Sequence, residues 1–483
     1  YEYDLVGNVI RQIDPRGNDM LVEVNELNQV VRKTTREVLV GTGTRYYRAY
    51  HYDANNNVVR IDVLNLDHHG EPQPNLLFSE FFEYELLNQL ISYTQEVDEN
   101  TRVVTEYRYD ANRNRIASRY GESVNGRQSA NGIDFVYDER DLLYRTIHGP
   151  GSNEQSTDEW SYDLNGNLTV RAFGIESDPR IQRTTYDGYD RKVGVMDPMG
   201  NERIYRYDPN HNLSSELFLG ELVDVSGGEG NRRLLEVGHR YDPLDRKIEM
   251  HRQFFDARTQ EAIGDGVSGD TFVYSDHSQV LQRINDNGHA VTRSFDTANR
   301  LARVVDAAGN IVSYEYDANS NVVALTEIEK SDLGKADELF VTRHSYDNLN
   351  RVIRTVDNVA NVTDMGYDSR HNKVFYSDAL RLGPEAAGNI QISEFDGLNR
   401  PVSTTRILTD SGRGEGAETG RIATLMRWDD SSRLTARVDD SGNATEFRYD
   451  ALNRVIERQS ADATLSKFSY DVHDNLVVTE DPN

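Results

Sequence analysis

The chain is 483 residues long, has no cysteine and carries a formal net charge of −28, with 37% hydrophobic residues and a mean hydropathy of −0.70. The lack of cysteine excludes a disulfide framework and thiol chemistry, and the negative charge disfavours general binding to nucleic acid, because phosphates would be repelled rather than neutralised. The low hydrophobic content favours a thin, single-layer β structure, wetted on part of both faces, over a two-layer sandwich.

A pair of residues, an aromatic one followed by a polar one, recurs from Tyr3-Asp4 to Tyr470-Asp471. Its first residue falls at positions 3, 24, 52, 84, 109, 137, 162, 186, 207, 241, 274, 295, 316, 346, 367, 395, 428, 449 and 470, with Val24 in the aromatic place of the second unit. We number these 19 units along the chain. Because the periodicity never lapses, the sequence predicts one continuous repeat array over residues 1–483, without an internal domain boundary.

Each unit has the pattern of a β-hairpin joined directly to the next, as the stretch from Phe295 to Tyr316 shows. A near turn opens at Asp296, directly after the aromatic position, and leads into the alternating segment 301–305. A far turn at 306–310 then leads into 311–316, which ends at the next aromatic position. Two strands per unit predict about 38 strands. At roughly 4.8 Å per strand the ribbon would run on the order of 180 Å, so we expect it to coil about once, with a diameter near 60 Å.

The fourth residue after the aromatic position, which we call position +4, is predicted to have a positive φ angle. It is Gly in two units, Asn in seven, Asp in four, and Ser, His or Arg in the other six. Gly, Asn and Asp adopt the left-handed conformation at the lowest cost, and no β-branched residue occurs at this position. Asp at position +1 is predicted to hold the turn by accepting backbone N–H groups. Arg113 is the residue that fits this pattern least.

Extra residues in the longer units all lie at the far turn. Neighbouring aromatic positions are 21 residues apart in seven cases and 24 to 34 apart in the other eleven. The additional loops include 66–74, 225–231, 264–270 and 411–420. Polar, Gly-rich loops of this kind are predicted to be solvent-exposed hairpin tips. One edge of the ribbon should therefore be even and the other fringed with variable loops.

The two faces of the ribbon are predicted to differ. The residue two before the aromatic position is itself aromatic in 11 of the 19 units, and the residue between them is often charged or polar. Because side chains alternate along a strand, paired rings should share one face and leave the other face polar. We expect the rings to pack between adjacent rungs, as cross-strand pairs do, and stacking on sugars is the alternative use of exposed Tyr and Trp.

These residues resemble the YD-repeat, or Rhs-repeat, family. The signature pair is Tyr-Asp in most units, Phe-Asp at Phe295 and Phe395, and Trp-Asp at Trp428, and the family's second turn is present as DPRGN at 14–18 and DAAGN at 306–310. Bacterial Rhs proteins, the B and C components of insecticidal Tc toxins and the animal teneurins belong to this family. The resemblance implies an all-β fold of tandem hairpins, in which one long antiparallel ribbon coils into a hollow shell or barrel-like tube. It also implies a secreted or cell-surface protein, bacterial in origin, whose shell encloses a C-terminal toxin domain.

The chain departs from the full family pattern in several places. It has no Gly/Pro-rich core with aspartyl self-cleavage residues, no toxin-like C-terminal domain and no propeller or adhesion module, so autoproteolysis and toxicity do not carry over. It also starts inside a repeat at Tyr1 and stops at Asn483, where a second turn should continue. We therefore expect a segment of a longer protein, with no signal peptide and no membrane span in this part.

No catalytic, cofactor-binding or metal-binding residue is predicted, and we expect neither a cofactor nor an enzyme. Acidic turns such as Asp53–Asn57 and Asp317–Asn321 imitate the start of an EF-hand loop but lack its Gly at the sixth position and Glu at the twelfth, which favours a role in capping the turn backbone. The adjacent pair His68-His69 is predicted to lie at a solvated loop tip rather than to bind metal. The Gly-rich loop from Gly412 to Gly416 fails the dinucleotide spacing and is predicted to be a plain loop.

The function that these patterns favour is a structural YD-repeat β-shell segment that encloses or displays another polypeptide, such as a toxin domain. A non-enclosing cell-surface or fibrous adhesion scaffold is the alternative, and a carbohydrate-binding β-helix is a weaker one. The expected partners are neighbouring repeats of the parent chain and either an enclosed toxin polypeptide or other shell subunits. Nucleic acid is not expected as a partner.

Overall fold

The computed structural model describes residues 1–220, 230–264, 266–331, 334–378, 388–412 and 416–481. Within these ranges it contains 38 β-strands and one short helix, α1 (Gly121–Val124). Each strand pairs antiparallel with the next along the chain, from β1–β2 to β37–β38. The predicted fold of consecutive hairpins in a single antiparallel sheet is confirmed.

The ends of the strands follow the repeat. Every odd-numbered strand ends at the first residue of the pair: β1 (Glu2–Tyr3), β3 (Asp19–Val24), β5 (Tyr47–Tyr52), β7 (Pro72–Tyr84), β9 (Arg102–Tyr109), β11 (Gly132–Tyr137), β13 (Ser156–Tyr162), β15 (Arg180–Tyr186), β17 (Glu202–Tyr207), β19 (Arg232–Tyr241), β21 (Ser268–Tyr274), β23 (Ala290–Phe295), β25 (Ile311–Tyr316), β27 (Glu338–Tyr346), β29 (Val362–Tyr367), β31 (Ile390–Phe395), β33 (Glu418–Trp428), β35 (Ala444–Tyr449) and β37 (Leu465–Tyr470). Every even-numbered strand follows a near turn: β2 (Val9–Ile13), β4 (Val30–Thr34), β6 (Val58–Leu66), β8 (Leu90–Glu96), β10 (Arg115–Arg119), β12 (Leu143–His148), β14 (Leu168–Phe173), β16 (Lys192–Met196), β18 (Leu213–Gly220), β20 (Lys247–Phe254), β22 (Val280–Asn285), β24 (Leu301–Val305), β26 (Val322–Glu329), β28 (Val352–Val356), β30 (Lys373–Ser377), β32 (Pro401–Thr409), β34 (Leu434–Val438), β36 (Val455–Gln459) and β38 (Leu476–Glu480).

The near turns have the backbone that the sequence predicts. All 19 residues at position +4 have a positive φ, between 58° and 97°, and Arg113 is among them with a φ of 73°. In unit 7, the Asp163 Oδ1 atom accepts the N–H groups of Asn165 and Asn167, both at 2.9 Å. The Gly166 N–H donates to the Asp163 carbonyl at 3.2 Å. This is a type I turn closed by a left-handed residue, which fixes the register of the hairpin.

The tyrosine of each pair links its unit to the preceding one. In unit 7 the Tyr162 hydroxyl donates to the Leu143 carbonyl of β12 at 2.8 Å. Every tyrosine at this position from Tyr52 onwards makes the equivalent bond, at 2.7 to 3.2 Å. In Trp428 the indole N–H takes over this role and donates to the Pro401 carbonyl at 2.8 Å. The hydroxyl therefore explains why this position favours Tyr over Phe.

Arginine or asparagine at position +5 also joins neighbouring near turns. The Arg300 Nε donates to Asp296 Oδ2 at 2.7 Å within its own turn, and its Nη1 donates to the Asp317 carbonyl of the next turn at 2.9 Å. The same guanidinium lies 4.5 Å from the centroid of the Tyr316 ring. In units with arginine at position +5, such as unit 12, the near turn is therefore bonded to the one after it through charge-assisted contacts.

The faces alternate as predicted, and arginine side chains cover several of the rings. The residue directly before the aromatic position is exposed in every unit except at Gly366, and the aromatic residue itself is half-buried in units 2 to 19. Rings of one strand approach each other, as Tyr314 and Tyr316 do at 6.4 Å between centroids. Rings of adjacent strands pack on each other at Phe82 of β7 and Tyr93 of β8, with centroids 5.0 Å apart. In units with arginine at position +5 the guanidinium covers the next ring, as Arg433 covers Tyr449 at 5.1 Å.

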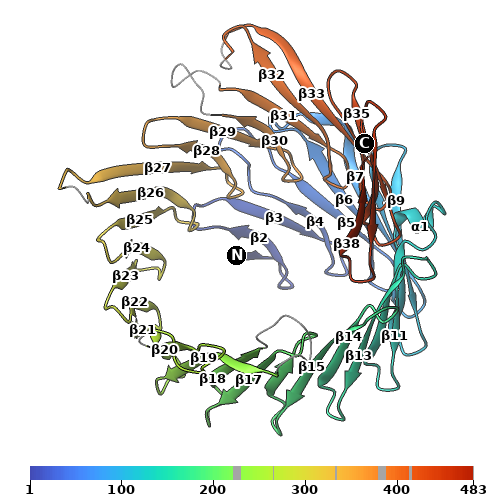
Figure 1. Cartoon of the computed structure of the whole chain (residues 1–483). Coiled ribbons are helices and arrows are strands. Elements are labelled where there is room, and N and C mark those ends of the chain that lie inside the picture. Colours follow the sequence, from blue (N-terminus) through green and yellow to red (C-terminus); the bar gives the residue numbers. More distant parts are fainter. Residues whose placement is uncertain (221–229, 265, 332–333, 379–387, 413–415, 482–483) are drawn as a thin grey trace.

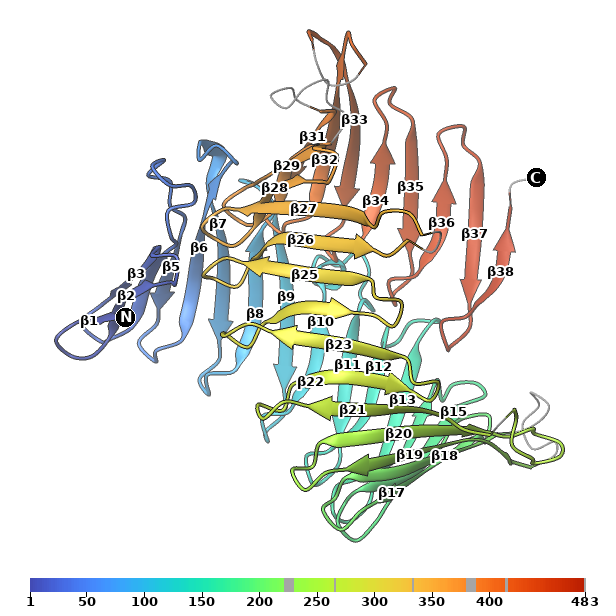
Figure 2. The same ribbon diagram turned by 90° about the vertical axis from the view of Figure 1, so that its left-hand side faces the viewer.

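Figure 1 looks into the coil and shows the strands arranged around an open centre. Strands near the N-terminus, drawn in blue, lie beside later strands drawn in orange, and Figure 2 shows the same coil from the side. Contacts join unit 2 to unit 14, unit 3 to unit 15 and unit 4 to unit 16, so one coil takes twelve units. The expectation of about one coil was too low, since the 19 units fill one coil and begin a second.

Candidate functional site

Where the second coil begins, it packs against the first along a line of contacts that we call the seam. Far turns of units 1–7 contact near turns of units 13–19 along it. The main-chain N–H groups of Asn348, Ser369 and Gly397, each at position +2, donate to carbonyls of the first coil at 2.9, 3.0 and 2.8 Å. In unit 15 the other four N–H groups, those of positions +1, +3, +4 and +5, bond within the near turn itself. The seam therefore uses the N–H of position +2, which is the one backbone donor that is not bonded within the near turn.

An apolar cluster lies under the seam at unit 14. Val38, Tyr46, Leu64 and Leu66 are buried together, and Leu349 of the near turn packs against them. Val38 and Tyr46 belong to the far turn between β4 and β5. The expectation that long far turns are solvent-exposed tips is therefore wrong here, and it is also wrong for Leu66 in the loop 66–74, because the second coil covers these side chains.

His68 shows how closely the far turns fit the second coil. Its ring stacks on Phe375 with centroids 5.3 Å apart and planes 11° from parallel, and burial lowers its pKa. A Cβ atom at Gly366 would lie only 2.9 Å from His68 Cδ2. This explains why Gly366 is the one glycine directly before an aromatic position. The prediction of a solvated tip is wrong for His68, whereas His69 is exposed.

Polar groups hold the seam farther along, beside α1. Asn131 has no exposed surface and donates through its amide to the Ala451 carbonyl at 2.9 Å. The Ser431 hydroxyl donates to Asn131 Oδ1 at 2.6 Å. The Asp430 N–H, again at position +2, donates to Glu122 Oε1 at 3.1 Å. These buried polar groups are satisfied by the other coil, so they specify which turns meet.

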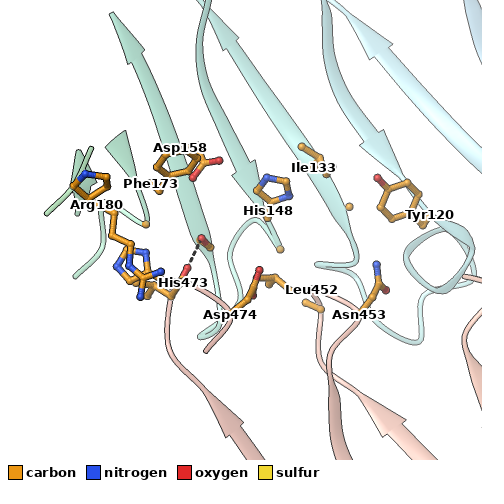
Figure 3. A pocket seen from close by; sticks show the side chains of 17 residues that line it. Tyr120, Ile133, His148, Asp158, Phe173, Arg180, Leu452, Asn453, His473 and Asp474 are labelled. Carbon is orange, nitrogen blue, oxygen red and sulfur yellow. Dashed lines mark hydrogen bonds between the residues drawn. The ribbon is translucent and has the colours of Figure 1, made fainter. Parts of the chain in front are cut away.

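A pocket of about 440 Å³ opens where the seam passes over β11 to β15. Figure 3 shows His148, Asp158 and Phe173 of the first coil facing Leu452 and His473 from near turns of the second. The Ser156 hydroxyl donates to the Val472 carbonyl at 2.8 Å and is therefore engaged in the seam rather than available as a nucleophile. Burial raises the pKa of Asp158, and the Coulombic interaction with His148 opposes that effect.

The carboxylates of the acidic turns accept hydrogen bonds from N–H groups of the same turn. In unit 7, Asp163 Oδ2 accepts the side-chain amide of Asn167 at 3.0 Å, and its Oδ1 already accepts two N–H groups. The pKa of Asp163 is lowered, first by the Asn167 side chain and then by its backbone N–H. Among the residues that the structure describes, no group of three or more acidic or histidine side chains could hold a metal ion.

Several predicted loops fall partly outside the described residues. Residues 413–415 of the Gly412–Gly416 loop, 225–229 of the loop 225–231 and residue 265 of the loop 264–270 belong to this group. Over the described ranges, no helix is long and apolar enough to cross a membrane.

Comparison with known proteins agrees with the repeat. A family model described as the RHS repeat matches residues 295–329 and 428–465. Together with the pair and turn pattern of all 19 units, these matches support an Rhs-repeat, or YD-repeat, protein. No curated protein matches the chain.

One solved structure shares the fold, and a second is similar at a lower score. A pore structure of the Photorhabdus luminescens Tc holotoxin, with a mutation in TccC3, has a TM-score of 0.59 and 12% identity over 99% of this chain. The crystal structure of TcdB2-TccC3-TEV has a TM-score of 0.39 and 11% identity over 96% of this chain. The chain spans 26% and 28% of these two proteins. The first likeness shows that this chain shares its coiled-ribbon fold with part of the Tc holotoxin structure.

The seam was missed by the sequence-based prediction, although two signals for it exist. The apolar run Val38-Leu39-Val40 lies in a far turn that the composition of the other far turns marks as exposed. Gly366 stands where the other units carry larger side chains. Each feature is explained only by contact between the two coils: Val38 of the apolar run is buried there, and the glycine makes room for His68.

Proposed function

We propose that the chain is a structural segment of an Rhs-repeat β-shell that encloses or displays another polypeptide, such as a C-terminal toxin domain of a secreted bacterial protein. The observation that carries this proposal is the seam. Far turns bonded to near turns one coil later make the coiled ribbon a continuous wall. A wall of this kind separates an interior from solvent, whereas an open ribbon would not.

The surface chemistry of the sheet also supports a container. Residues directly before the aromatic position are exposed and mostly polar or charged, and the apolar cluster of Val38, Tyr46, Leu64 and Leu66 lies under the seam rather than on an open face. A largely polar wall can surround an unfolded or partly folded chain without binding it tightly. We further propose that residues 1–483 form one array without an internal domain boundary, with no enzymatic activity of its own.

A non-enclosing adhesion scaffold is the rival function. A fibre needs the ribbon to extend, and the twelve-unit offset of the seam instead returns the ribbon to its own edge. The enclosing function is therefore the better supported of the two.

Limited proteolysis of the full-length parent protein tests the proposal. We expect a C-terminal domain inside the shell to be cut much more slowly than the same domain produced alone. In the matched variant Gly397→Glu, the new side chain would meet the Glu96 carbonyl and the Phe78 ring, open the seam and restore cleavage. Cleavage at the same rate inside and outside the shell would contradict enclosure and favour the scaffold.

A further inference from the structure

The pocket of about 440 Å³ on the seam has walls from both coils of the chain. Its floor is the face of β11 to β14 to which His148 and Asp158 point, since Ser156, two residues before Asp158, pairs with His148. The opposite wall comes from the near turns of units 18 and 19, at Leu452 and His473. Figure 3 shows these two residues across the pocket from His148 and Asp158. The cavity therefore lies between parts of the chain that are one coil apart.

Two glycines let the second coil come close enough to form this wall. A Cβ atom at Gly149 would lie 2.5 Å from Leu452 Cδ1, and one at Gly174 would lie 2.7 Å from His473 Cε1. Both glycines also have a positive φ, of 60° and 61°. Close packing of the turns thus sets the shape of the pocket before any ligand binds.

Several polar groups in the pocket have unused capacity for hydrogen bonds. The Asp158 carboxylate accepts the Gly174 N–H, and no side chain of the described structure donates to it. The His148 ring and the Tyr120 hydroxyl make no hydrogen bond to any residue that the structure describes. The side-chain N–H groups of Asn453 likewise donate to no described residue. Half-buried polar groups in this state mark a place where a ligand can supply the partners.

The chemistry of these groups disfavours three classes of ligand. An apolar ligand would cover Asp158 and leave its carboxylate short of donors. An anion would be repelled by Asp158 and by Asp474, which also lines the pocket. A small amine would satisfy the carboxylates and leave the N–H groups of Asn453 without an acceptor. The pocket requires a ligand that donates and accepts hydrogen bonds at several points.

We propose that the pocket binds a carbohydrate of one or two sugar rings. Each sugar hydroxyl can donate to Asp158 or accept from Asn453, and His148 and Tyr120 can take either role. The C–H face of a sugar ring can pack on the Phe173 ring, which lines the same cavity. The volume of about 440 Å³ lies toward the lower end of the range of about 300–1,000 Å³ for ligand pockets. This inference does not depend on whether the shell encloses a polypeptide.

Saturation-transfer difference NMR with the 483-residue chain tests the proposal. The probes are glucose, galactose, mannose, N-acetylglucosamine, lactose and maltose at millimolar concentration, with ethanolamine and inorganic phosphate representing the amine and anion classes. We expect at least one sugar to bind, and neither ethanolamine nor phosphate. Titration of that sugar then gives the affinity for the wild type and for each variant.

Two substitutions in the pocket should weaken the sugar. Asp158→Val suits a strand and removes the acceptor, so affinity should fall about tenfold or more. Tyr120→Phe removes only the hydroxyl, and affinity should fall about two- to tenfold. Because this hydroxyl has no partner within the described protein, Tyr120→Phe keeps the test valid if Asp158→Val does not fold. Thermal unfolding shows which variants are folded.

Glu327→Val is the matched control. Glu327 is exposed on the corresponding face of β26, where it pairs with Val312, and lies outside the pocket, so affinity should not change. Sugar that merely stacks on an exposed ring, such as Tyr189, would bind equally to wild type, Asp158→Val and Tyr120→Phe, and this result would overturn the proposal. Binding by none of the sugars would overturn it too. Binding of ethanolamine or phosphate in place of sugar would overturn the assigned ligand class.

Discussion

At the scale of the residue, the tyrosine of each pair connects two units through its hydroxyl group. The sequence showed that an aromatic residue recurs, and strand alternation predicted which face it takes. It did not predict the hydroxyl bond, because the carbonyl acceptor lies 15 to 28 residues earlier and no local pattern marks it. After unit 2, Phe295 and Phe395 are the aromatic residues at this position that have no polar group to make the bond.

Tyr162→Phe should weaken the link between units 6 and 7. Removal of one hydroxyl-to-carbonyl bond is expected to cost about 0.5–1.5 kcal/mol. In a repeat array the effect stays local, so hydrogen exchange of amides in β12 and β13 is the suitable measurement. Tyr189→Phe is the matched control, because Tyr189 is exposed and its hydroxyl makes no hydrogen bond. Equal exchange in both variants would show that the hydroxyl bond contributes nothing.

Position +4 gives a second test at this scale. Gly166→Val and Asn453→Val force a β-branched residue to a φ of 87° and 67°, at an expected cost of about 1–2 kcal/mol each. Arg113→Gly should be neutral or stabilising, since Arg113 has a φ of 73°. Earlier proteolysis of the affected hairpin is the expected signal. Thr297→Val, at position +2 of an exposed near turn, serves as control, and equal sensitivity there would contradict the turn argument.

At the scale of the element, most near turns have an aspartate at position +1, whereas unit 2 has Asn25 and unit 11 has Ser275. Asn25 holds this place in unit 2 and accepts the same two N–H groups, from Leu27 and Gln29, both at 3.0 Å. An amide can therefore replace the carboxylate without a change of turn geometry. Asp and Asn differ at this position because acid can protonate the carboxylate of Asp and has no such effect on the amide of Asn.

Acid should loosen the near turns that have aspartate. The pKa of Asp163 is lowered from 3.8, first by the Asn167 side chain, so its stabilising effect is complete above 3.8 and is lost as pH falls through the lowered value. Protection of the Gly166 amide against hydrogen exchange, corrected for intrinsic exchange rates, should fall below pH 3.8 in the wild type. In Asp163→Asn the corrected protection should change much less. Parallel loss in both proteins would place the acid sensitivity elsewhere.

The seam also requires a close fit between hairpins of the two coils, and a substitution at Gly366 tests this fit. Gly366→Glu introduces at unit 15 the residue type that units 1 and 13 have as Glu2 and Glu315, but here the side chain meets His68. Overpacking of this kind costs about 1–3 kcal/mol. The Ser369 amide, which donates to the Leu66 carbonyl, should exchange faster.

Two companion variants separate the clash from the new charge. Ser294→Glu places the same residue before the aromatic position of unit 12, outside the seam, and should leave exchange unchanged. His68→Ala combined with Gly366→Glu should restore much of the lost protection. If the Ser369 amide is protected no better in the double variant than in Gly366→Glu alone, the result would contradict the proposed clash.

At the scale of the whole molecule, the hairpin count, strand ends and turn backbone could be predicted from the sequence, and the path of the coil could not. The turns are local: Asp296 and Asn299 define a near turn with the residues between them. The coil is the sum of small twists over many strands, so nothing near Val38 indicates that Asn348 will meet it. Far turns such as the one around Val38 were therefore predicted to be exposed, although their apolar side chains lie under the next coil.

The central claim is that the ribbon returns to its own edge after twelve units. Because the chain has no cysteine, two cysteines can be introduced and joined without background. His69 of unit 3 and Ser345 of unit 14 line one pocket beside the seam. In a chain with His69→Cys and Ser345→Cys, a short bismaleimide should join the two residues within one monomer, whereas a His69→Cys and Ser294→Cys pair should not be joined. Failure of the first pair to react within a folded monomer, or equal reaction of both pairs, would contradict the coil.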